Sequence, residues 1–454
     1  MSETHYDLIV IGSGSGLNVA SAAVNQLGWR VAIIEKGPVG GTCLNRGCIP
    51  SKMVIHAADV AEEISRSEIF GISSEITGID FAKITNRANE MVDADSHQIE
   101  ENLRKHSKID LYKGEGAFSA QKKVIVNDQE ISGDRVLIAA GARPFVPPIE
   151  GIDKVNYWTS TEALRQTVQP RSMVVIGGGY IGMELGHFYG ALGTEITVIE
   201  ALPTLISRED KDISETFTKL FSDKYTVHLN SKVMRVSQDQ AGEKTVAFQT
   251  QDGQEQLIET DAILLVTGTK PNADTLHLEN TQVQTSERGY ITFNEHMETN
   301  EENACALGDI VGIAPFKHGA NYEAQIVFNN MTTENKLTAD YTIMPHAIFT
   351  SPQIAGVGLT QQEAEEKGLS YEVRRHDYIK TGMGKAIEAE NGFVKFIINP
   401  QEQTILGCHI LGPEASTLIH EVIVAMKHGG SKISAIKDTI HIHPALNEVV
   451  QRAL

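Results

Sequence analysis

Two glycine-rich turns, each set between a short apolar run and a helix-like segment, constrain the fold of this 454-residue chain more than any other feature. A β-rich run at 6–11 breaks into a Gly-Ser-Gly-Ser-Gly turn at 12–16, and the chain extends again at 31–34 and ends the run on Glu35. The same order returns over 172–200. A strand, a turn, a helix and a second strand closed by an acid form the pattern of a dinucleotide-binding βαβ unit. We therefore predict two Rossmann-like units.

The first turn is predicted to hold a dinucleotide through Gly12, Gly14 and Gly16. Glycines let the phosphates approach the backbone, and the following helix N-terminus offers unpaired N–H groups. Glu35 is then expected to accept hydrogen bonds from ribose hydroxyls. The alternative is a packing turn with a solvated acid. Leu17 occupies the third-glycine position of the strict pattern, which weakens this copy.

The second turn has all its glycines, at Gly177, Gly179 and Gly182, and its closing strand ends on Glu200. No arginine stands next to Glu200 to meet a 2′-phosphate, so we expect NAD rather than NADP. The alternative is that Glu200 is only a surface acid.

The chain has four cysteines, and two of them, Cys43 and Cys48, stand close together in a glycine-flanked segment at 40–52. A thiol near a helix N-terminus has a lowered pKa, and we expect the two to meet across one helical turn and form a reversible disulfide. Half of a metal site or two inert thiols are the alternatives. Because no second pair has ligand spacing, we predict no metal site.

Near the C-terminus, His443 and Glu448 stand five residues apart. A histidine oriented by a carboxylate is suited to proton transfer in thiol–disulfide exchange. Taken alone, the pattern also fits a structural histidine.

Composition excludes several classes of partner. The formal charge of −20 repels nucleic acid and anionic membrane surfaces. No apolar run approaches the roughly 18–20 residues that span a bilayer. Residues 1–11 lack the basic and long apolar regions of a signal peptide, and so few cysteines argue against a secreted scaffold. We expect a cytoplasmic protein.

Strand-like segments at 136–141 and 262–268 are predicted to return beneath the two cofactors, and a helical stretch is predicted from 53 to about 106. The proline-containing segments at 144–148 and 270–272 are interpreted as domain crossings. The fold class is therefore α/β, with two Rossmann-like dinucleotide-binding domains and a C-terminal α+β domain. The boundaries follow: 1–146 and 271–340 for the two parts of the first domain, 147–270 for the second domain, and 341–454 for the third.

The order of these motifs resembles the flavoprotein pyridine nucleotide–disulfide oxidoreductase family essentially end to end. The 40–52 block is the most specific element, and Ala139-Ala140-Gly141, Val266-Thr267-Gly268, Asp309 and His443-Pro444 agree with it. The resemblance implies FAD and NAD as cofactors and a homodimer built by the C-terminal domain. It implies two sets of cofactor residues: Gly12, Gly14, Gly16, Glu35, Lys52, Ala140, Gly141 and Asp309 for FAD, and Gly177, Gly179, Gly182, Glu184, Glu200 and Gly268 for NAD.

The resemblance also implies a division of labour at the catalytic site. Cys48 would lie against the flavin and Cys43 would face the substrate. Lys52 and Glu184 would form a buried pair beside the flavin. His443, held by Glu448, would act as the acid–base group across the dimer interface. Cys305 and Cys408 match no redox position and are expected to be core thiols.

Within the family, the second unit, which ends on an acid, and the His-Ile-His-Pro motif look most like dihydrolipoyl dehydrogenase. The Ile11–Gly16 segment and the Ala347–Thr350 segment look closer to mycothione reductase. We expect the first activity, on a free dithiol or on a lipoyl group of a carrier domain. The alternatives are a reductase of a low-molecular-weight thiol disulfide, or a flavin redox sensor or assembly subunit with little turnover.

Overall fold

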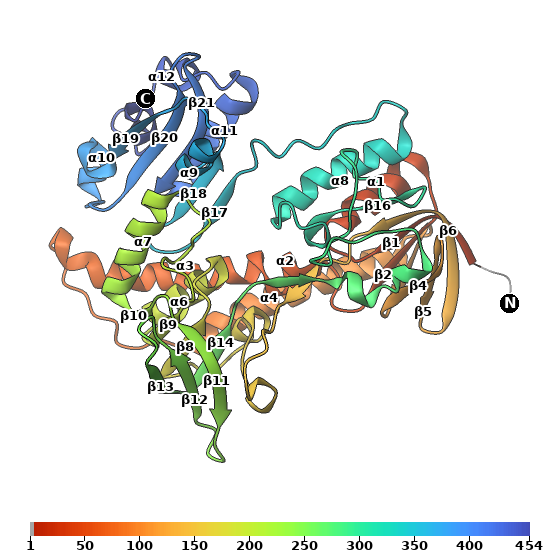
Figure 1. The fold of residues 1–454 in the computed structure, drawn as a ribbon, viewed down its shortest axis with the longest axis horizontal. Coiled ribbons are helices and arrows are strands. Elements are labelled where there is room, and N and C mark those ends of the chain that lie inside the picture. Colours follow the sequence, from red (N-terminus) through yellow and green to blue (C-terminus); the bar gives the residue numbers. More distant parts are fainter. Residues whose placement is uncertain (1–3) are drawn as a thin grey trace. The chain divides into compact units, whose positions relative to one another are not determined.

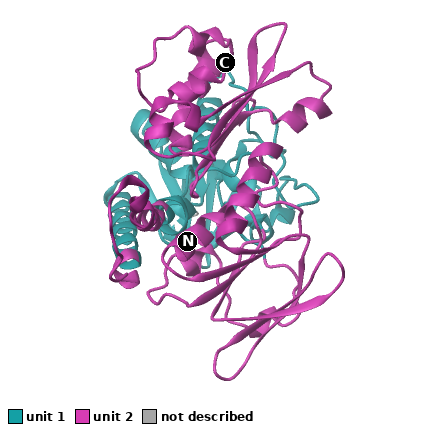
Figure 2. Ribbon diagram, turned by 90° about the vertical axis from the view of Figure 1, so that its left-hand side faces the viewer, with its two compact units in different colours: residues 1–51, 85–145, 268–341 teal, residues 52–84, 146–267, 342–454 magenta. Residues whose placement is uncertain are grey.

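The structure, a computed structural model, describes residues 4–454. The first three residues of the stretch expected to lack an export signal lie outside the described residues. The chain divides into two compact units, each built from three separate segments (Figure 2). Unit 1 comprises residues up to 51, 85–145 and 268–341, and unit 2 comprises 52–84, 146–267 and 342–454. Unit 2 thus contains 147–267 of the predicted second domain and 342–454 of the predicted third domain, together with 52–84, which the prediction places in the first domain.

A mixed sheet forms the centre of unit 1 (Figure 1). Within residues 4–454 it has seven strands, in the order β3-β2-β1-β6-β5-β4, with β16 also paired to β6. Pairing is parallel from β3 to β6 and to β16, and antiparallel for β5 and β4. The strands are β1 (Thr4–Ile11), β2 (Val31–Glu35), β3 (Ile109–Lys113), β4 (Gly116–Ala120), β5 (Lys123–Val126), β6 (Gln129–Ile138) and β16 (Ala304–Ala306).

The parallel strands of unit 1 are apolar and buried where they cross its core, as expected when both faces of a sheet are covered. Every residue of β2 is buried, and α1 (Gly16–Leu27) packs against α8 (Lys317–Thr332). Unit 1 also contains α2 (Gly41–Arg46) and short 3₁₀ turns at η3 (Asn272–Thr275), η4 (Leu278–Asn280) and η5 (Gly308–Ile310).

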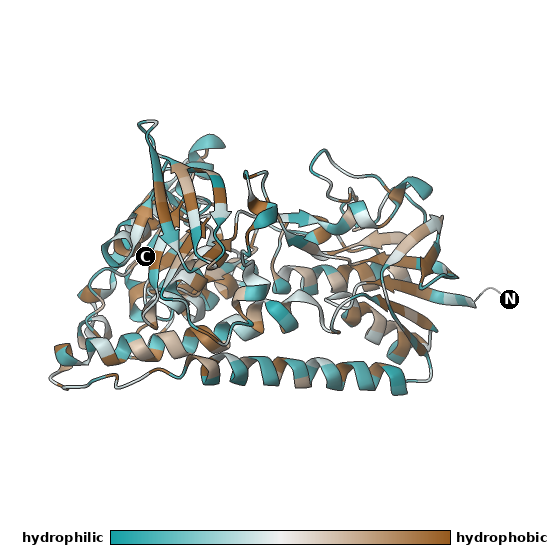
Figure 3. Ribbon diagram, turned by 90° about the horizontal axis from the view of Figure 1, so that it is seen from below, coloured by the Kyte–Doolittle hydropathy of each residue, from teal (hydrophilic) through white to brown (hydrophobic). Residues whose placement is uncertain are grey.

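The helical stretch predicted from 53 to 106 is two helices. α3 (Cys48–Arg66) ends in the 3₁₀ turn η1 (Ser67–Phe70), and α4 begins only at Phe81 and runs to Lys105. Gly71 terminates η1 with a φ of 76°, and the Ser74 hydroxyl donates to the carbonyl of Ile64 at 2.9 Å. These local bonds replace helical ones, so the chain turns instead of continuing. Hydrophilic residues predominate along α4, as Figure 3 shows.

The two proline-containing segments interpreted as domain crossings lie beside unit boundaries, which fall at 145/146 and 267/268. β7 (Ala142–Pro144) and β15 (Thr269–Pro271), which end in these segments, pair antiparallel in a two-stranded ribbon of unit 1. Each proline stands at the end of its strand, where a missing N–H costs least.

Unit 2 contains a Rossmann-type portion and a C-terminal portion, and each has its own hydrophobic core. Among the described residues it has sheets of four, three and five strands. The parallel sheet has the order β10 (Thr226–His228), β9 (Glu195–Ile199), β8 (Ser172–Ile176) and β14 (Ala262–Leu265). An antiparallel meander follows, with β11 (Lys232–Gln238), β12 (Lys244–Gln249) and β13 (Glu255–Thr260).

The C-terminal sheet of unit 2 is antiparallel. Its order is β17 (His346–Ile348), β18 (Ile354–Gly358), β21 (Thr404–Leu411), β20 (Phe393–Asn399) and β19 (Glu372–Asp377). The longer helices of unit 2 are α6 (Tyr180–Ala191), α7 (Lys211–Lys224) and α11 (Ala415–His428). Its shorter helices are η2 (Ile152–Lys154), α5 (Ser160–Ala163), α9 (Gln361–Glu366), η6 (Tyr378–Lys380), α10 (Gly382–Ala386), α12 (Ser434–Lys437) and α13 (Glu448–Arg452). Among the described residues, no helix is both long and apolar enough to cross a membrane.

Candidate functional site

The first glycine turn joins β1 to α1 and has no room for a side chain at Gly12 or Gly16. Gly12 has a φ of +104°, and a Cβ there would lie 2.2 Å from the carbonyl oxygen of Ala139. A Cβ on Gly16 would lie 2.8 Å from the Val10 side chain, so the close helix–strand approach falls on Gly16 and not on residue 17. A Cβ on Gly14 would meet nothing within 4 Å. The turn therefore presents bare backbone, as a pyrophosphate requires.

Glu35 closes this turn. Its Oε2 accepts from the Ser13 backbone N–H at 3.0 Å and from the Ser13 hydroxyl at 2.6 Å, and its Oε1 accepts from the Gly37 N–H at 2.6 Å. The side chain is buried. Since a carboxylate accepts about four hydrogen bonds, it can still accept one from a ribose hydroxyl. The sequence analysis did not identify Ser13.

Helix α1 begins at Gly16 without a side-chain cap, because Ser15 makes no capping hydrogen bond. Its first N–H groups and the bare glycine turn therefore suit an anionic dinucleotide, and the residues present fit the phosphates of FAD. Ala140 and Gly141 follow β6, and their carbonyls accept from the side chain and the backbone of Asn272 at 2.8 and 3.0 Å.

Asp309 lies in η5, and burial raises the pKa of its carboxyl group, opposed by the charge of Lys317. Glu323 of α8 is a buried acid that sequence reasoning missed. It accepts from the Gly308 N–H at 2.6 Å and from the Tyr341 hydroxyl at 2.9 Å. Burial nevertheless raises the pKa of Glu323 to about 7.

Cys43 and Cys48 lie on two consecutive helices and not on one helical turn. α2 ends at Arg46 and α3 begins at Cys48, with Gly47 between them. A Cβ on Gly47 would lie 2.9 Å from the Thr42 carbonyl oxygen and 3.3 Å from the Cys43 Cα. Only glycine fits this approach, which turns Cys48 back toward Cys43.

Both cysteines are thiols in this structure, and they share a hydrogen bond. This bond is the largest cause of a raised pKa of the Cys43 thiol; burial adds to it, and the charge of Lys317 opposes it. The raised pKa is opposite to the lowering expected at a helix N-terminus. Asn45 fixes the segment by donating to the carbonyls of Val39 and Gly41, each at 3.0 Å.

The second glycine turn joins β8 to α6 in unit 2. Gly177 has a φ of +112°, and a Cβ there would lie 2.7 Å from the Val266 carbonyl oxygen. A Cβ on Gly182 would lie 2.4 Å from the Gly177 carbonyl oxygen, and one on Gly179 would meet nothing within 4 Å. The residues present thus fit a second pyrophosphate.

Glu200 stands at the end of β9 and contacts this turn. Its Oε2 accepts from the Gly178 N–H at 2.5 Å, and its Oε1 accepts from the Leu202 N–H at 2.8 Å. Gly268, which was predicted with these residues, belongs to unit 1. There it has a φ of +126°, and its carbonyl accepts from the Phe145 N–H at 2.9 Å.

Lys52 and Glu184 form an ion pair in unit 2, with 2.6 Å between Nζ and Oε2. The other oxygen of Glu184 accepts from the Phe349 N–H at 2.9 Å, and the Lys52 ammonium lies 4.4 Å from the centre of the Phe349 ring. The predicted pair is therefore assembled from α3 and α6. Its place beside the flavin stays a prediction.

A buried triad that the sequence analysis missed begins at Tyr180, the first residue of α6. The Tyr180 hydroxyl donates to Glu209, whose other oxygen lies 2.8 Å from Nε2 of His346. The Tyr180 and His346 rings are stacked, and the Glu209 side chain is fully buried. No sequence spacing links these three residues.

His443 Nδ1 lies 3.0 Å from Glu448 Oε1, so the predicted pair forms. Glu448 also accepts from Arg452 at 2.9 Å, and the hydrogen bond with His443 is the main cause of its lowered pKa. The His443 side chain is 70% exposed.

The residues before His443 alternate in exposure. The His441 side chain is largely covered and lies 3.0 Å from Glu421, whereas Ile440 is 97% exposed and Ile442 is 77% exposed. Apolar side chains this exposed beside a charged pair are typical of a surface that another chain covers.

Cys305 and Cys408 are buried. Burial raises the pKa of the Cys305 thiol to about 12, and burial also raises the pKa of the Cys408 thiol. Within residues 4–454, no group of three or more histidine, cysteine or acidic side chains is arranged to hold a metal ion.

Comparison with known families gives two matches that together span almost the whole chain. Residues 6–327 match the family described as pyridine nucleotide-disulphide oxidoreductase, and residues 344–454 match the dimerisation domain of pyridine nucleotide-disulphide oxidoreductases.

Among characterised relatives, a mycothione reductase of Mycobacterium tuberculosis is 35% identical, with 99% of this chain and 98% of the relative covered. A dihydrolipoyl dehydrogenase of Bacillus subtilis is 33% identical, with 98% and 95% covered. A mercuric reductase of Staphylococcus aureus is 35% identical, with 93% and 77% covered. Among solved structures, a Cu(II) complex of the HOCl-induced flavoprotein disulfide reductase RclA from Escherichia coli superposes with a TM-score of 0.88. It shares 28% identity and covers 100% of this chain and 99% of that one.

Proposed function

Because the chain belongs to the pyridine nucleotide-disulphide oxidoreductase family, we propose that it transfers two electrons between NAD(H) and a small disulfide or dithiol through Cys43 and Cys48. The single observation that carries this proposal is the close approach at Gly47, where a Cβ would lie 3.3 Å from the Cys43 Cα, so that Cys48 turns back toward Cys43. The first specific activity that we propose is that of a dihydrolipoyl dehydrogenase, in which a dihydrolipoamide dithiol and NAD⁺ give lipoamide, NADH and a proton.

Enzymes of this family use FAD. Gly12, Gly14 and Gly16 would hold its phosphates, Glu35 its ribose, and Asp309 the region toward the ring. FAD, when bound, relays the two electrons between the nicotinamide and the disulfide. The support for these roles is the bare backbone of the first turn and the uncapped start of α1.

We assign the nicotinamide nucleotide to the second turn. Glu200 supports NAD over NADP because a carboxylate accepts from the ribose hydroxyls and repels a 2′-phosphate. Its hydrogen bonds with Gly178 and Leu202 hold that negative charge at the turn.

At the disulfide, one substrate thiolate attacks the Cys43 sulfur, the Cys43–Cys48 bond breaks, and Cys48 leaves as a thiolate. The second substrate thiol, after losing its proton, attacks its own mixed disulfide with Cys43, and Cys43 leaves. The substrate has then lost two electrons and two protons, and the cysteine pair is reduced. The reverse sequence reduces a disulfide.

Each attack needs a base that keeps the attacking sulfur deprotonated. We assign this role to His443, oriented by Glu448, acting on the disulfide of the partner subunit. The support is the 3.0 Å pair, the exposure of His443, and its place in a dimerisation domain.

The mycothione reductase relative keeps a second substrate class open, the disulfides of low-molecular-weight thiols. The relative from Escherichia coli is described as a Cu(II) complex, so Cu(II) ion is a third oxidant to test.

The test is steady-state kinetics of the flavin-loaded dimer. NADH and NADPH are each paired with lipoamide, glutathione disulfide, mycothiol disulfide and a Cu(II) salt, and dihydrolipoamide is tested with NAD⁺. Highest efficiency with lipoamide and NADH supports the first proposal. Higher efficiency with another disulfide replaces it by the second, and no turnover with any disulfide while NADH still reduces the flavin would refute both.

A further inference from the structure

A lysine that the sequence analysis did not single out lies beside the redox pair of unit 1. Lys317 is the first residue of α8, and its Nζ donates to the Ser15 hydroxyl at 3.0 Å. Ser15 in turn donates to the side chain of Asn321 at 2.9 Å, and Asn18 donates to the same oxygen at 2.9 Å. The start of α8 is thereby bonded to the first glycine turn.

Helix α2, which carries Cys43, is attached to the same turn. The Gly40 N–H donates to the Ser13 hydroxyl at 3.1 Å. The backbones of Gly41 and Gly14 are so close that a Cβ on Gly41 would lie 2.6 Å from the Gly14 Cα. Residues 13–15 therefore contact α2 on one side and Lys317 on the other, which brings the lysine and Cys43 into one cluster.

Two side chains are the main electrostatic influences on the Cys43 thiol. From α3 it faces Cys48, and from α8 it faces Lys317, whose positive charge acts to lower the pKa of the Cys43 thiol. Lys317 acts in the same direction on Asp309. Lys317 is thus the cation within reach of both groups in this cluster.

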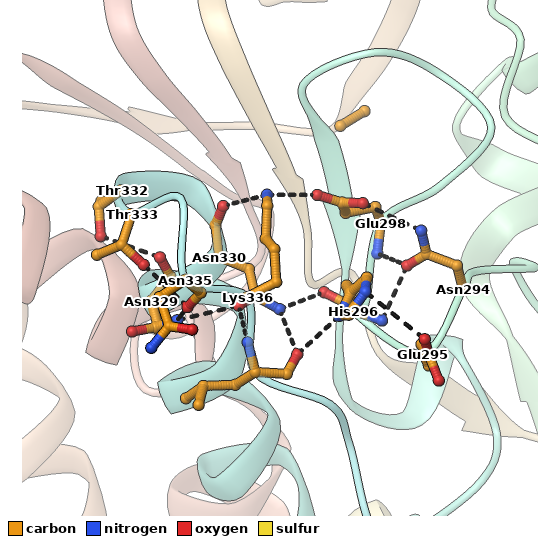
Figure 4. A network of polar contacts seen from close by, with 12 residues as sticks. Asn294, Glu295, His296, Glu298, Asn329, Asn330, Thr332, Thr333, Asn335 and Lys336 are labelled. Atoms are coloured by element: carbon orange, nitrogen blue, oxygen red, sulfur yellow. Dashed lines mark hydrogen bonds and ion pairs between the residues drawn. The ribbon is translucent and has the colours of Figure 1, made fainter.

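The position of Lys317 is set by the fold because α8 is also anchored at its other end, as Figure 4 shows. The Asn330 side chain donates to the carbonyls of His296 and Leu337 at 3.0 and 2.8 Å and accepts from the Leu337 N–H at 2.7 Å. Lys336 reaches Glu298 at 2.6 Å. The backbone of α8 is thus held at both ends, and the hydrogen bond to Ser15 positions the Lys317 ammonium.

We propose that Lys317 stabilises the thiolate of reduced Cys43 and so extends disulfide exchange to lower pH, an inference that rests on the proposed redox role of the pair. In the exchange, the Cys43 thiolate attacks one sulfur of the substrate disulfide. That S–S bond breaks, and the released substrate thiolate takes up a proton. Cys48, as a thiolate, then attacks Cys43, releases the second substrate thiol and forms the Cys43–Cys48 disulfide. The pair loses the two electrons that the substrate gains, and Lys317 transfers no proton itself.

The test measures Cys43 directly and needs no substrate. The flavin-loaded enzyme is reduced anaerobically, and carbamidomethylation of Cys43 by iodoacetamide is followed by peptide mass spectrometry across a range of pH. In Lys317→Met the midpoint of the alkylation profile should rise by about one pH unit, the size expected when a nearby opposite charge is lost. Lys317→Arg should keep the wild-type midpoint. Lys211→Met is the matched control, since Lys211 is the exposed first residue of α7.

An unchanged midpoint in a flavin-loaded Lys317→Met enzyme would overturn the inference. Should that variant not load flavin, Lys317→Gln keeps a polar side chain of similar length. Loss of flavin from both neutral variants, with flavin retained by Lys317→Arg, would also overturn the inference, because the positive charge at residue 317 would then serve to bind the cofactor. A wild-type enzyme whose Cys43 is alkylated equally before and after reduction would instead refute the redox role of the pair.

Discussion

Glu35 and Glu200 make the same set of backbone hydrogen bonds in different units. In each, Oε2 accepts from the N–H of the residue after the first glycine of the turn, and Oε1 accepts from the N–H two residues beyond the glutamate. Each acid therefore ties the end of its strand to the glycine turn before any ribose is bound.

The nucleotide preference tests the role of Glu200. We expect Glu200→Gln, which keeps an acceptor but removes the charge, to reduce the preference for NADH over NADPH by about tenfold or more, because one charge-assisted hydrogen bond contributes roughly 1.5–3 kcal/mol. The ratio of kcat/KM values measures this. Glu195→Gln, at the exposed start of the same strand, should leave the ratio unchanged. A wild-type ratio that already favours NADPH would contradict the assignment.

The two thiols should differ in their effect on the flavin spectrum. Cys43→Ser leaves a thiolate at Cys48, which we expect to lie against the flavin and to produce a long-wavelength absorbance band. Cys48→Ser should abolish that band, and Cys305→Ser, at a buried thiol, should not affect it. Both active-site variants should lose disulfide turnover while NADH still reduces the flavin. Identical spectra from Cys43→Ser and Cys48→Ser would show that the division of labour is wrong.

Loss of the histidine should slow exchange and spare flavin reduction. His443→Ala should lower disulfide turnover by about 10²–10⁴-fold, the range for loss of a positioned acid–base group. His428→Ala, an exposed histidine at the end of α11, is the control.

Mixed dimers show which subunit His443 serves. Inactive Cys43→Ser and His443→Ala chains are combined under subunit exchange. If His443 acts across the two-fold axis, a heterodimer has one site with both lesions and one intact site, so about half the wild-type activity should return. Heterodimers that form, as native mass spectrometry shows, but remain inactive would exclude action across the interface.

Burial of Glu323 predicts a stability that falls with pH. Its pKa is raised from 4.5 to about 7, so between these values the folded state holds a proton that the unfolded state has lost. Stability should therefore decrease as pH rises from about 4.5 to about 7, by on the order of 3 kcal/mol. Glu323→Gln should lack this decrease. The melting temperature of the variant minus that of wild type should therefore be several degrees larger at pH 8 than at pH 5. Thermal melts of flavin-loaded protein measure it, with the exposed Glu334→Gln as control; parallel pH profiles of wild type and Glu323→Gln would disprove it.

Local patterns predicted much of the fold. The strand–turn–helix order around Gly12 and Gly177 corresponds to β1–α1 and β8–α6. The His443–Glu448 contact also followed from spacing. These features depend on residues near one another in the chain, where periodicity and turn chemistry carry the information.

Other features depend on residues that are distant in sequence. Lys317 lies 302 positions from Ser15, and Glu209 lies 137 positions from His346, so no spacing announces either contact. The break at Gly47 was missed for another reason. The need for glycine at this position becomes apparent only in the structure, where a Cβ on Gly47 would lie 2.9 Å from the Thr42 carbonyl oxygen.

If His443 acts on the partner's disulfide as proposed, the exposure of Ile440 and Ile442 makes the activity depend on protein concentration. These side chains precede the histidine that we assign to the partner's disulfide, so the apolar surface that favours association and the group that completes catalysis are parts of one segment. Dissociation by mass action would uncover two isoleucines and abolish both sites together. Freshly diluted enzyme would then lose specific activity at the rate at which dimers separate, and newly made chains would be both inactive and prone to aggregate until they find each other.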